Sequence, residues 1–308
     1  MSLKPKNLHD FIPWILFVSI ATMLAGDIMG EVLLPPVSED QAFLFTFNSY
    51  AIFAFLWVVL AGVIIIFKKN RFILMAFKPT KAIIGSRLKG NTLYALGAGL
   101  LVGFLLNGVC ALIAYAHGDF TLEFKQFDWL YVLALCIAVF IQSAGEEALC
   151  RGFMYQRLLH ATHKPYIAVW INAVFFGVMH LFNDGMSLLA FYDMVITGVF
   201  FSLVVVYFDS LWMAMGIHTT WNFTQSILLG LPNSGASFPY SIFGLDAGAV
   251  HASFAYNAAF GLEGTLLSAS VMTLCCIGLY LHHRFSSQRS QTNQTDCYIA
   301  QSNAPSEQ

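Results

Sequence analysis

Charge is scarce in this 308-residue sequence: only 10% of its residues are Asp, Glu, Lys or Arg, and 58% are hydrophobic. Ordinary soluble domains carry about 25% charged residues. Together with a mean hydropathy of +0.69, this composition excludes a typical soluble domain and predicts a polytopic membrane protein. A net charge of −2 gives no indication of a nucleic-acid partner. The partner that the composition requires is the lipid bilayer.

The sequence also lacks a cysteine framework. Its six cysteines resemble neither a disulfide scaffold nor a zinc knuckle in their spacing, and those within apolar runs are interpreted as small core residues. No cleavable signal peptide is expected, because the first apolar run, beginning at Phe11, is too long and contains Asp27 and Glu31. This run is interpreted as a retained membrane span.

Hydropathy predicts an all-α, polytopic transmembrane bundle of about eight spans, since a helix needs about 20 residues to cross the hydrocarbon core. The expected spans are residues 11–34, 43–67, 91–116, 128–160, 166–183, 187–208, 211–229 and 262–284. The fourth is too long for the bilayer, so its second half is expected to project from the membrane or lie along its surface. Residues 1–284 are predicted to form the membrane domain, and residues 285–308, rich in Ser, Gln, Asn and Thr, a disordered tail.

Basic residues are unevenly distributed among the predicted loops. Loop 68–90 holds seven of the fifteen Lys and Arg residues. With both termini in the cytoplasm, and with Arg151 counted on that side, only Lys125 falls outside. Because basic residues favour cytoplasmic loops, we predict that both termini are cytoplasmic. Segment 71–89 alternates apolar and basic residues, and two interpretations stay open: it lies flat on an anionic leaflet, or it is a plain basic connector.

Two adjacent glutamates lie in an apolar stretch of the predicted fourth span. An ionisable side chain at membrane depth costs roughly 2.5–3.5 kcal/mol on insertion scales, so its presence there indicates function. Glu147 and Arg151 are four residues apart and share a helical face, which predicts an ion pair. Glu146 lies about 100° away around the helix and has no such partner. We therefore predict that Glu147 is structural and Glu146 is available for chemistry.

Further polar residues lie in predicted spans five and seven. His180 is in span five, and His218 and Asn222 share a helical face in span seven. A lone histidine or asparagine in an apolar helix is more often a core residue than a catalyst, and Asn172 and Asp193 are assigned such structural roles. Buried polar groups must nevertheless find partners where water is absent. We therefore predict that the glutamates, the histidines and Asn222 surround one wet cavity.

Three motifs follow in order along these spans, and they read EExxxR, FxxxH and HxxxN. They are Glu146-Glu147-Ala148-Leu149-Cys150-Arg151, Phe176-Gly177-Val178-Met179-His180 and His218-Thr219-Thr220-Trp221-Asn222. Together they resemble the CPBP intramembrane proteases, the CAAX-protease and bacteriocin-processing family. The resemblance covers residues 128–284, which are taken as the protease core.

The resemblance implies peptide-bond hydrolysis inside the membrane by a glutamate-dependent mechanism. It implies that Glu146 and His180 hold and activate a water molecule, and that His218 and Asn222 stabilise the oxyanion. It also implies supporting roles for Glu147, Arg151 and Phe176. Chemistry agrees, because a carboxylate shielded from bulk water is an effective general base. No intramembrane Ser or Cys forms an obvious dyad with these histidines, which argues against covalent catalysis.

Two alternatives stay open. Two histidines plus a glutamate match the three-ligand set of catalytic zinc, although the HExxH motif is absent and asparagine is a poor zinc ligand; we expect no cofactor. A non-catalytic immunity factor, scaffold or transporter also places polar groups at membrane depth, although the repeated halves typical of transporters are absent from the sequence.

The resemblance implies a peptide or protein substrate, with prenylated CAAX proteins as the eukaryotic option and peptide processing or immunity as the bacterial one. We expect a bacterial cytoplasmic membrane, because the sequence carries no endoplasmic reticulum retrieval signal. The sequence leaves open the identity of the substrate, the leaflet from which it approaches, and the oligomeric state.

Overall fold

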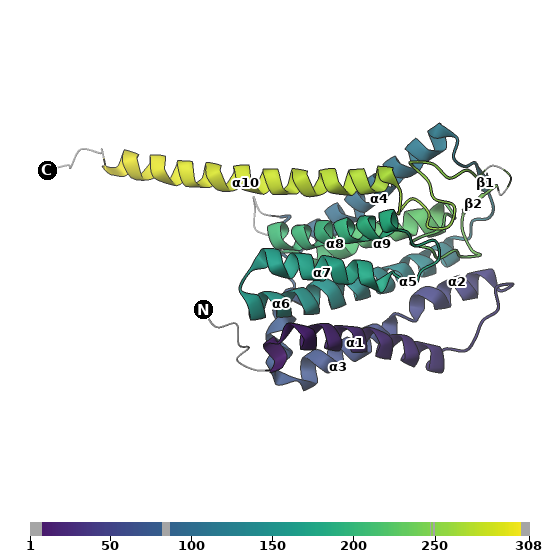
Figure 1. The fold of residues 1–308 in the computed structure, drawn as a ribbon, viewed down its shortest axis with the longest axis horizontal. Coiled ribbons are helices and arrows are strands. Elements are labelled where there is room, and N and C mark those ends of the chain that lie inside the picture. The colour runs from purple at the N-terminus through teal and green to yellow at the C-terminus, as the bar shows by residue number, and fades with distance from the viewer. Residues whose placement is uncertain (1–7, 82–86, 247, 249, 303–308) are drawn as a thin grey trace.

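The computed structural model describes residues 8–81, 87–246, 248 and 250–302, with side chains described up to residue 284. The chain is mostly α-helical, as predicted, and its helices run side by side along one long axis (Figure 1). The α-helices are α1 (Ile12–Leu33), α2 (Ala42–Ala51), α3 (Ala54–Ile66), α4 (Leu93–His117), α5 (Trp129–Glu147), α6 (Tyr155–Thr162), α7 (Pro165–Met179), α8 (Leu188–Phe208), α9 (Leu211–Asn222) and α10 (Leu266–Ser302).

Six described helical segments are long and apolar enough to cross a membrane, which supports an integral multi-pass membrane protein. They are Ile12–Leu33, Ala42–Ile66, Leu93–His117, Trp129–Thr162, Leu188–Phe208 and Leu266–Arg284. Predicted span five corresponds to α7, whose 15 residues are fewer than the about 20 that a simple crossing requires. Predicted span seven corresponds to α9, with 12 residues, continued directly by the π-helix η4 (Phe223–Leu228). The count of eight spans and the cytoplasmic position of the termini stay predictions.

Two π-helices interrupt the bundle next to the predicted motifs. η3 (Ala148–Met154) begins directly after Glu147, and η4 (Phe223–Leu228) begins directly after Asn222. A π-helix widens the backbone spiral and is often found at functional sites. Because hydrophobic periodicity carries no signal for it, the sequence predicted continuous α-helix in both places.

Close contact with α4 fixes the position of α9. Gly99 and Gly103 lie directly against the backbone of α9, where a Cβ atom would clash with the carbonyl oxygens of Met213 and Ile217. Small residues four apart commonly permit such an approach between membrane helices. Thr220 Oγ1 adds a hydrogen bond to the carbonyl oxygen of Leu100 at 2.7 Å. These contacts set the depth and rotation of the helix that carries His218.

The two ends of the bundle are built differently. At one end, the 3₁₀-helices η1 (Leu8–Asp10) and η2 (Lys68–Phe77) lie close to α6. At the other end, strand β1 (Leu122–Phe124) pairs antiparallel with β2 (Phe243–Leu245), placing Glu123 opposite Gly244 (Figure 1). The loop between η4 and α10 lies at this second end (Figure 1).

One expectation needs correction, and others are described only in part. Arg151 is fully buried, so it belongs to the core and is no marker of the cytoplasmic side. In the second half of predicted span four, Tyr155, Arg157 and Leu158 of α6 are buried against neighbouring elements; its place relative to the membrane stays a prediction. The backbone of α10 is helical to Ser302; the boundary at residue 284 and the disordered tail stay predictions, and residues 303–308 lie outside the described residues. Segment 71–89 is described only in part, and its first residues belong to η2.

Candidate active site

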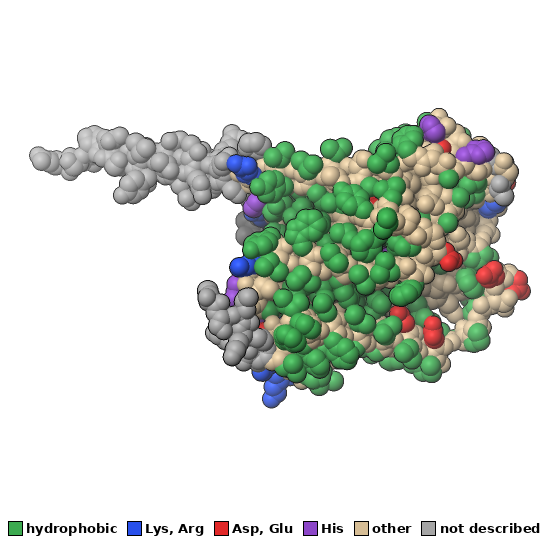
Figure 2. Space-filling model, in the orientation of Figure 1, with side chains coloured by type: hydrophobic (Ala, Val, Ile, Leu, Met, Phe, Trp, Pro, Cys, Tyr) green, Lys and Arg blue, Asp and Glu red, His purple; other side chains and the backbone are tan. Residues whose placement is uncertain are grey.

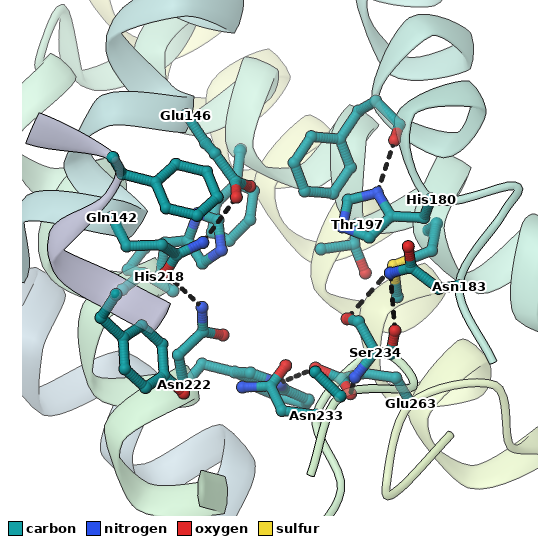
Figure 3. A pocket seen from close by; sticks show the side chains of 18 of the residues that line it. Gln142, Glu146, His180, Asn183, Thr197, His218, Asn222, Asn233, Ser234 and Glu263 are labelled. Atoms are coloured by element: carbon teal, nitrogen blue, oxygen red, sulfur yellow. Dashed lines mark hydrogen bonds between the residues drawn. The ribbon is translucent and has the colours of Figure 1, made fainter. Parts of the chain in front are cut away.

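One cavity of about 320 Å³ brings the predicted catalytic residues together. Glu146 of α5, His180 after α7, and His218 and Asn222 of α9 all line it, as does Phe176. Figure 3 shows Glu146, Gln142 and Asn222 along one side of the cavity and His180 with Asn183 facing them. Glu147 and Arg151 do not line it.

Within the part of the chain that the structure describes, only one of the two carboxylate oxygens of Glu146 accepts a hydrogen bond. Gln142, one helical turn earlier on α5, donates a hydrogen bond from Nε2 to Glu146 Oε1 at 2.5 Å. The sequence predicted no ion-pair partner for Glu146; its partner in the structure is a neutral amide, which a search for opposite charges does not find. Its second oxygen, Oε2, is buried and has no hydrogen-bond partner among the described residues. One oxygen is thus fixed while the other is available to a guest in the cavity.

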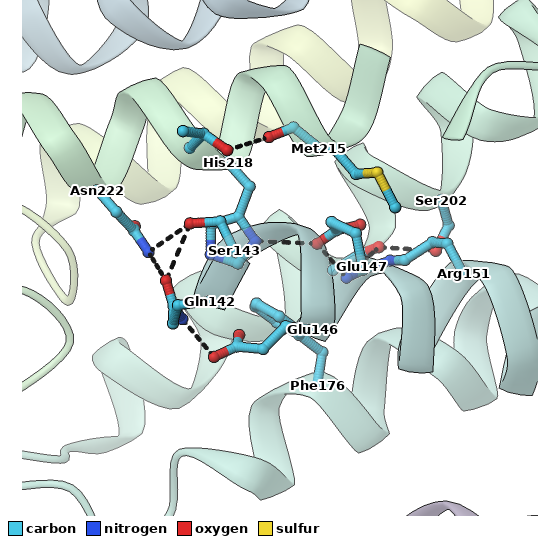
Figure 4. A network of polar contacts seen from close by, with 12 residues as sticks. Gln142, Ser143, Glu146, Glu147, Arg151, Phe176, Ser202, Met215, His218 and Asn222 are labelled. Atoms are coloured by element: carbon cyan, nitrogen blue, oxygen red, sulfur yellow. Dashed lines mark hydrogen bonds and ion pairs between the residues drawn. The ribbon is translucent and has the colours of Figure 1, made fainter. Parts of the chain in front are cut away.

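Gln142 also joins Glu146 to Asn222. Its Oε1 accepts hydrogen bonds from Asn222 Nδ2 at 3.0 Å and from Ser143 Oγ at 2.9 Å. Asn222 Nδ2 makes a second, longer contact of 3.3 Å with Ser143 Oγ. The amide of Gln142 therefore connects Asn222 on α9 with Glu146 on α5 and fixes their relative positions (Figure 4). Gln142 and Ser143 were missed from the sequence, although Gln142 precedes Glu146 by one turn in the same apolar run.

Glu147 and Arg151 form the predicted ion pair. Arg151 Nη1 lies 2.8 Å from Glu147 Oε1, and both side chains are 0% exposed. Arg151 Nη2 donates to the carbonyl oxygen of Gly198 at 3.0 Å. The guanidinium also lies over the rings of Phe176 and Phe201, at 4.6 and 5.2 Å from their centroids, where the electron-rich ring faces favour a cation. The charge pair is thus held by contacts from α7 and α8 as well as within its own segment.

His218 joins this buried pair rather than Glu146. Its Nδ1 lies 3.1 Å from Glu147 Oε1 (Figure 4), and its ring stacks on Phe201 with centroids 5.2 Å apart. A proton on Nδ1 is therefore donated to Glu147, which leaves Nε2 as the second ring nitrogen. The contact between Glu147 and His218 links two motifs and could not be read from the spacing of either.

His180 ends α7 instead of lying inside a helix. Its Nδ1 lies 2.8 Å from the carbonyl oxygen of Phe176, so a proton on Nδ1 is donated to the backbone and Nε2 keeps its lone pair in the neutral ring. The side chain is half-buried. The ring of Phe176 lies 4.9 Å from that of His180 and 6.1 Å from that of His218. Phe176 therefore contacts both histidines as well as Arg151.

A buried carboxylate that was not predicted as a site residue, Glu263, also lines the cavity. Glu263 accepts three hydrogen bonds, from Trp221 Nε1 at 2.6 Å, Gln225 Nε2 at 2.7 Å and the backbone amide of Ser234 at 2.8 Å. Three donors satisfy an ionised carboxylate, which only accepts. The one sequence signal was an acidic residue within the apolar, glycine-flanked stretch Gly261-Leu262-Glu263-Gly264. Asn172 and Asp193 have the structural bonds expected of them, to Cys150 and Gly264.

The arrangement does not match the zinc alternative. Within the described residues, no three His, Cys, Asp or Glu side chains are grouped so that they could hold a metal ion. Glu147 Oε1 already serves Arg151 and His218, so this oxygen is not free to bind a metal ion. A three-ligand zinc set is therefore not preformed in the cavity.

Comparison with protein families agrees with the motifs. Residues 128–224 match the family model described as Rce1-like, type II CAAX prenyl endopeptidase. The match contains Glu146, His180, His218 and Asn222, and it confirms the resemblance predicted from the sequence. Searches of curated proteins and of solved structures found no match.

Proposed function

We propose, from the likeness of residues 128–224 to the Rce1-like type II CAAX prenyl endopeptidases, that this multi-pass membrane protein is an intramembrane endopeptidase. One observation carries the proposal. Glu146 presents a buried, unpartnered Oε2 in a cavity that two histidines also line. Buried polar atoms are almost always paired, so an unpaired carboxylate oxygen facing a cavity suits a polar guest such as water.

In this proposal Glu146 is the general base. A water molecule donates one hydrogen bond to Glu146 Oε2 and another to the lone pair of His180 Nε2. Glu146 removes a proton as the water oxygen attacks the carbonyl carbon of the peptide bond. The C–N bond then breaks, and the proton on Glu146 passes to the leaving amine. A positioned general base typically contributes 10²–10⁴-fold to the rate, and the hydrogen bond from Gln142 fixes the carboxylate plane for this transfer.

His218 and Asn222 stabilise the oxyanion in the same proposal, and the geometry sets a condition on each. His218 must carry a proton on Nε2 while Nδ1 keeps its own proton, which it donates in a hydrogen bond to Glu147. Asn222 must turn one Nδ2 proton away from Ser143, which costs little because that contact is the longer one at 3.3 Å. A donor aimed at the developing negative charge is worth about 3–4 kcal/mol.

Glu147 has a different role from Glu146. Its Oε1 serves both Arg151 and His218, so its charge is committed to holding the histidine. We assign it, with Arg151 and Phe176, to support of the site. No metal or other cofactor is part of this mechanism.

The proposed substrate is a peptide or protein, with prenylated CAAX proteins as one class, and the proposed location is a bacterial cytoplasmic membrane. The activity and the substrate class are tested with a fluorogenic peptide library that includes prenylated CAAX peptides, incubated with purified protein and with Glu146→Gln. Cleavage by the parent chain alone supports the endopeptidase. No cleavage by either protein favours the non-catalytic immunity or scaffold alternative.

A further inference from the structure

The cavity is closed toward the end of the bundle that carries η1 and η2. Every residue of η3, which begins directly after Glu147, is buried. Gly152 of η3 packs directly against Phe77 and Leu211, and Arg151 fills the space behind Glu147 with a fully buried side chain. A peptide cannot pass through this layer without unpacking it.

The cavity is bounded by loops at the other end. Asn183, Asn233, Ser234, Ala236 and Phe238 line it from the segments after α7 and η4. Ala236 is exposed to the surroundings and Ser234 is half-exposed. Asn183 Nδ2 donates to the carbonyl oxygen of Ser234 at 2.7 Å, joining the two loops beside the opening. The cavity therefore communicates with the end that carries β1 and β2.

These two ends differ in charge. Figure 2 shows Lys and Arg side chains gathered at the end where α1 begins and Asp and Glu side chains gathered toward the opposite end, which also carries the exposed Lys125 beside β1. The basic end includes exposed Lys68, Lys69, Arg71 and Lys164. The opposite end includes exposed Glu31, Glu39, Asp40 and Asp184. Because basic residues favour the cytoplasmic side of a membrane, the charge distribution places the closed end in the cytoplasm and the opening on the other side.

We propose that the substrate reaches Glu146 from the acidic, non-cytoplasmic end of the bundle. The substrate class is then a polypeptide segment exposed on that side of the membrane, such as an exported or membrane-tethered peptide. That a substrate enters the cavity rests on the proposed function. The direction in which the cavity opens rests on packing and charge alone. It disfavours prenylated proteins that remain in the cytoplasm.

Cysteine accessibility tests the direction of the opening without requiring cleavage. Thr197→Cys places a thiol in the cavity wall on α8, Asp184→Cys places one beside the opening, and Lys164→Cys places one at the basic end. Each variant is treated with the membrane-impermeant cation 2-(trimethylammonium)ethyl methanethiosulfonate in right-side-out and in inverted membrane vesicles. Mass spectrometry locates the modified residue, and the parent chain, with its own six cysteines, is treated in parallel.

We expect Thr197→Cys and Asp184→Cys to react at least tenfold faster in right-side-out vesicles, and Lys164→Cys at least tenfold faster in inverted ones. Reaction of Thr197→Cys from the same side as Lys164→Cys, or from neither side, overturns the direction of the opening. Reaction of Thr197→Cys and Asp184→Cys only in inverted vesicles overturns the non-cytoplasmic assignment. None of these results depends on proteolysis, so they are separate from a failure of the peptide-cleavage experiment.

Discussion

Glu146 and Glu147 are covalent neighbours in different surroundings. Glu147 points into the packed layer between α5, α8 and α9, where Arg151 and His218 share one of its oxygens and Phe176 and Phe201 cover the guanidinium. Glu146 points into the cavity and receives one bond from Gln142. Each glutamate has one oxygen without a partner among the described residues, and of the two residues only Glu146 lines the cavity. Because neighbouring residues of an α-helix are rotated by about 100°, the carboxylate of Glu147 lies in the packed layer and that of Glu146 lies in the cavity.

The two carboxylates are thus stabilised by different means. The charge of Glu147 is offset by a cation in contact, and a buried pair of this kind tolerates desolvation only when its geometry and hydrogen bonds are good. The charge of Glu146 is offset by one amide hydrogen bond and, in the proposed mechanism, by the water molecule in the cavity. Substitutions in the two groups should therefore damage different properties, activity in one and stability in the other.

The largest expected effect is on catalysis. Glu146→Gln removes the base but keeps the size of the side chain, so we expect the kcat for peptide cleavage to fall by about 10³–10⁴-fold while the thermal unfolding midpoint in detergent stays close to that of the parent. Activity within tenfold of the parent would contradict the role of Glu146. Glu147→Gln is the matched control, and it should lower the unfolding midpoint clearly more than Glu146→Gln does.

Removing the cation of the buried pair should have the next largest effect, this time on stability. Arg151→Ala leaves Glu147 charged and buried, which costs about 3–5 kcal/mol in the free energy of unfolding, measured by denaturation in mixed detergent micelles. Arg71→Ala is the control, because Arg71 is exposed and exposed substitutions usually change stability by less than about 0.5 kcal/mol. If Arg151→Ala is as stable as the parent, the two glutamates are not stabilised by different means.

Both histidines should also be required for cleavage. We expect His218→Ala to lower kcat by about 10²–10³-fold, as for loss of an oxyanion donor, and His180→Ala to lower it within the 10²–10⁴-fold range of a group that positions the water. His218→Ala should in addition lower the unfolding midpoint, since it removes a partner of Glu147, whereas the ring of His180 bonds to a backbone carbonyl. Equal stability losses in the two variants would argue against this difference.

Gln142 should have a smaller effect. Gln142→Ala removes a hydrogen bond that orients Glu146, so we expect kcat to fall by about tenfold with KM nearly unchanged, in line with the roughly 1 kcal/mol that one hydrogen bond contributes. The readout is the separate kcat and KM of purified protein. An effect on KM alone would show that Gln142 binds substrate instead of positioning the base.

Chelation is expected to have no effect. Because the described residues offer no three-ligand metal set, cleavage should persist after treatment with 1,10-phenanthroline and repurification in metal-free buffer. Loss of activity that returns specifically with added zinc would restore the metal-dependent alternative and would change the roles assigned to both histidines.

Local sequence spacing determined a large part of this protein. The scarcity of charge predicted a multi-pass helical membrane protein, and the spacing of Glu147 and Arg151 predicted their ion pair, because residues four apart in a helix are neighbours whatever surrounds them. The three motifs also identified the family resemblance and the polar residues that meet at the cavity. All of these features depend on composition or on one helical turn.

Only the tertiary structure decided which partners these residues have. The bonds from His218 to Glu147 and from Asn222 to Gln142 join α9 to α5 across about 70–80 residues of chain, and Gly99 and Gly103 of α4 let that helix pack directly on the backbone of α9. The π-helices after Glu147 and Asn222 shift the residues beyond them away from α-helical periodicity. Contacts between distant segments depend on how whole helices pack, and no local pattern in the sequence specifies that packing.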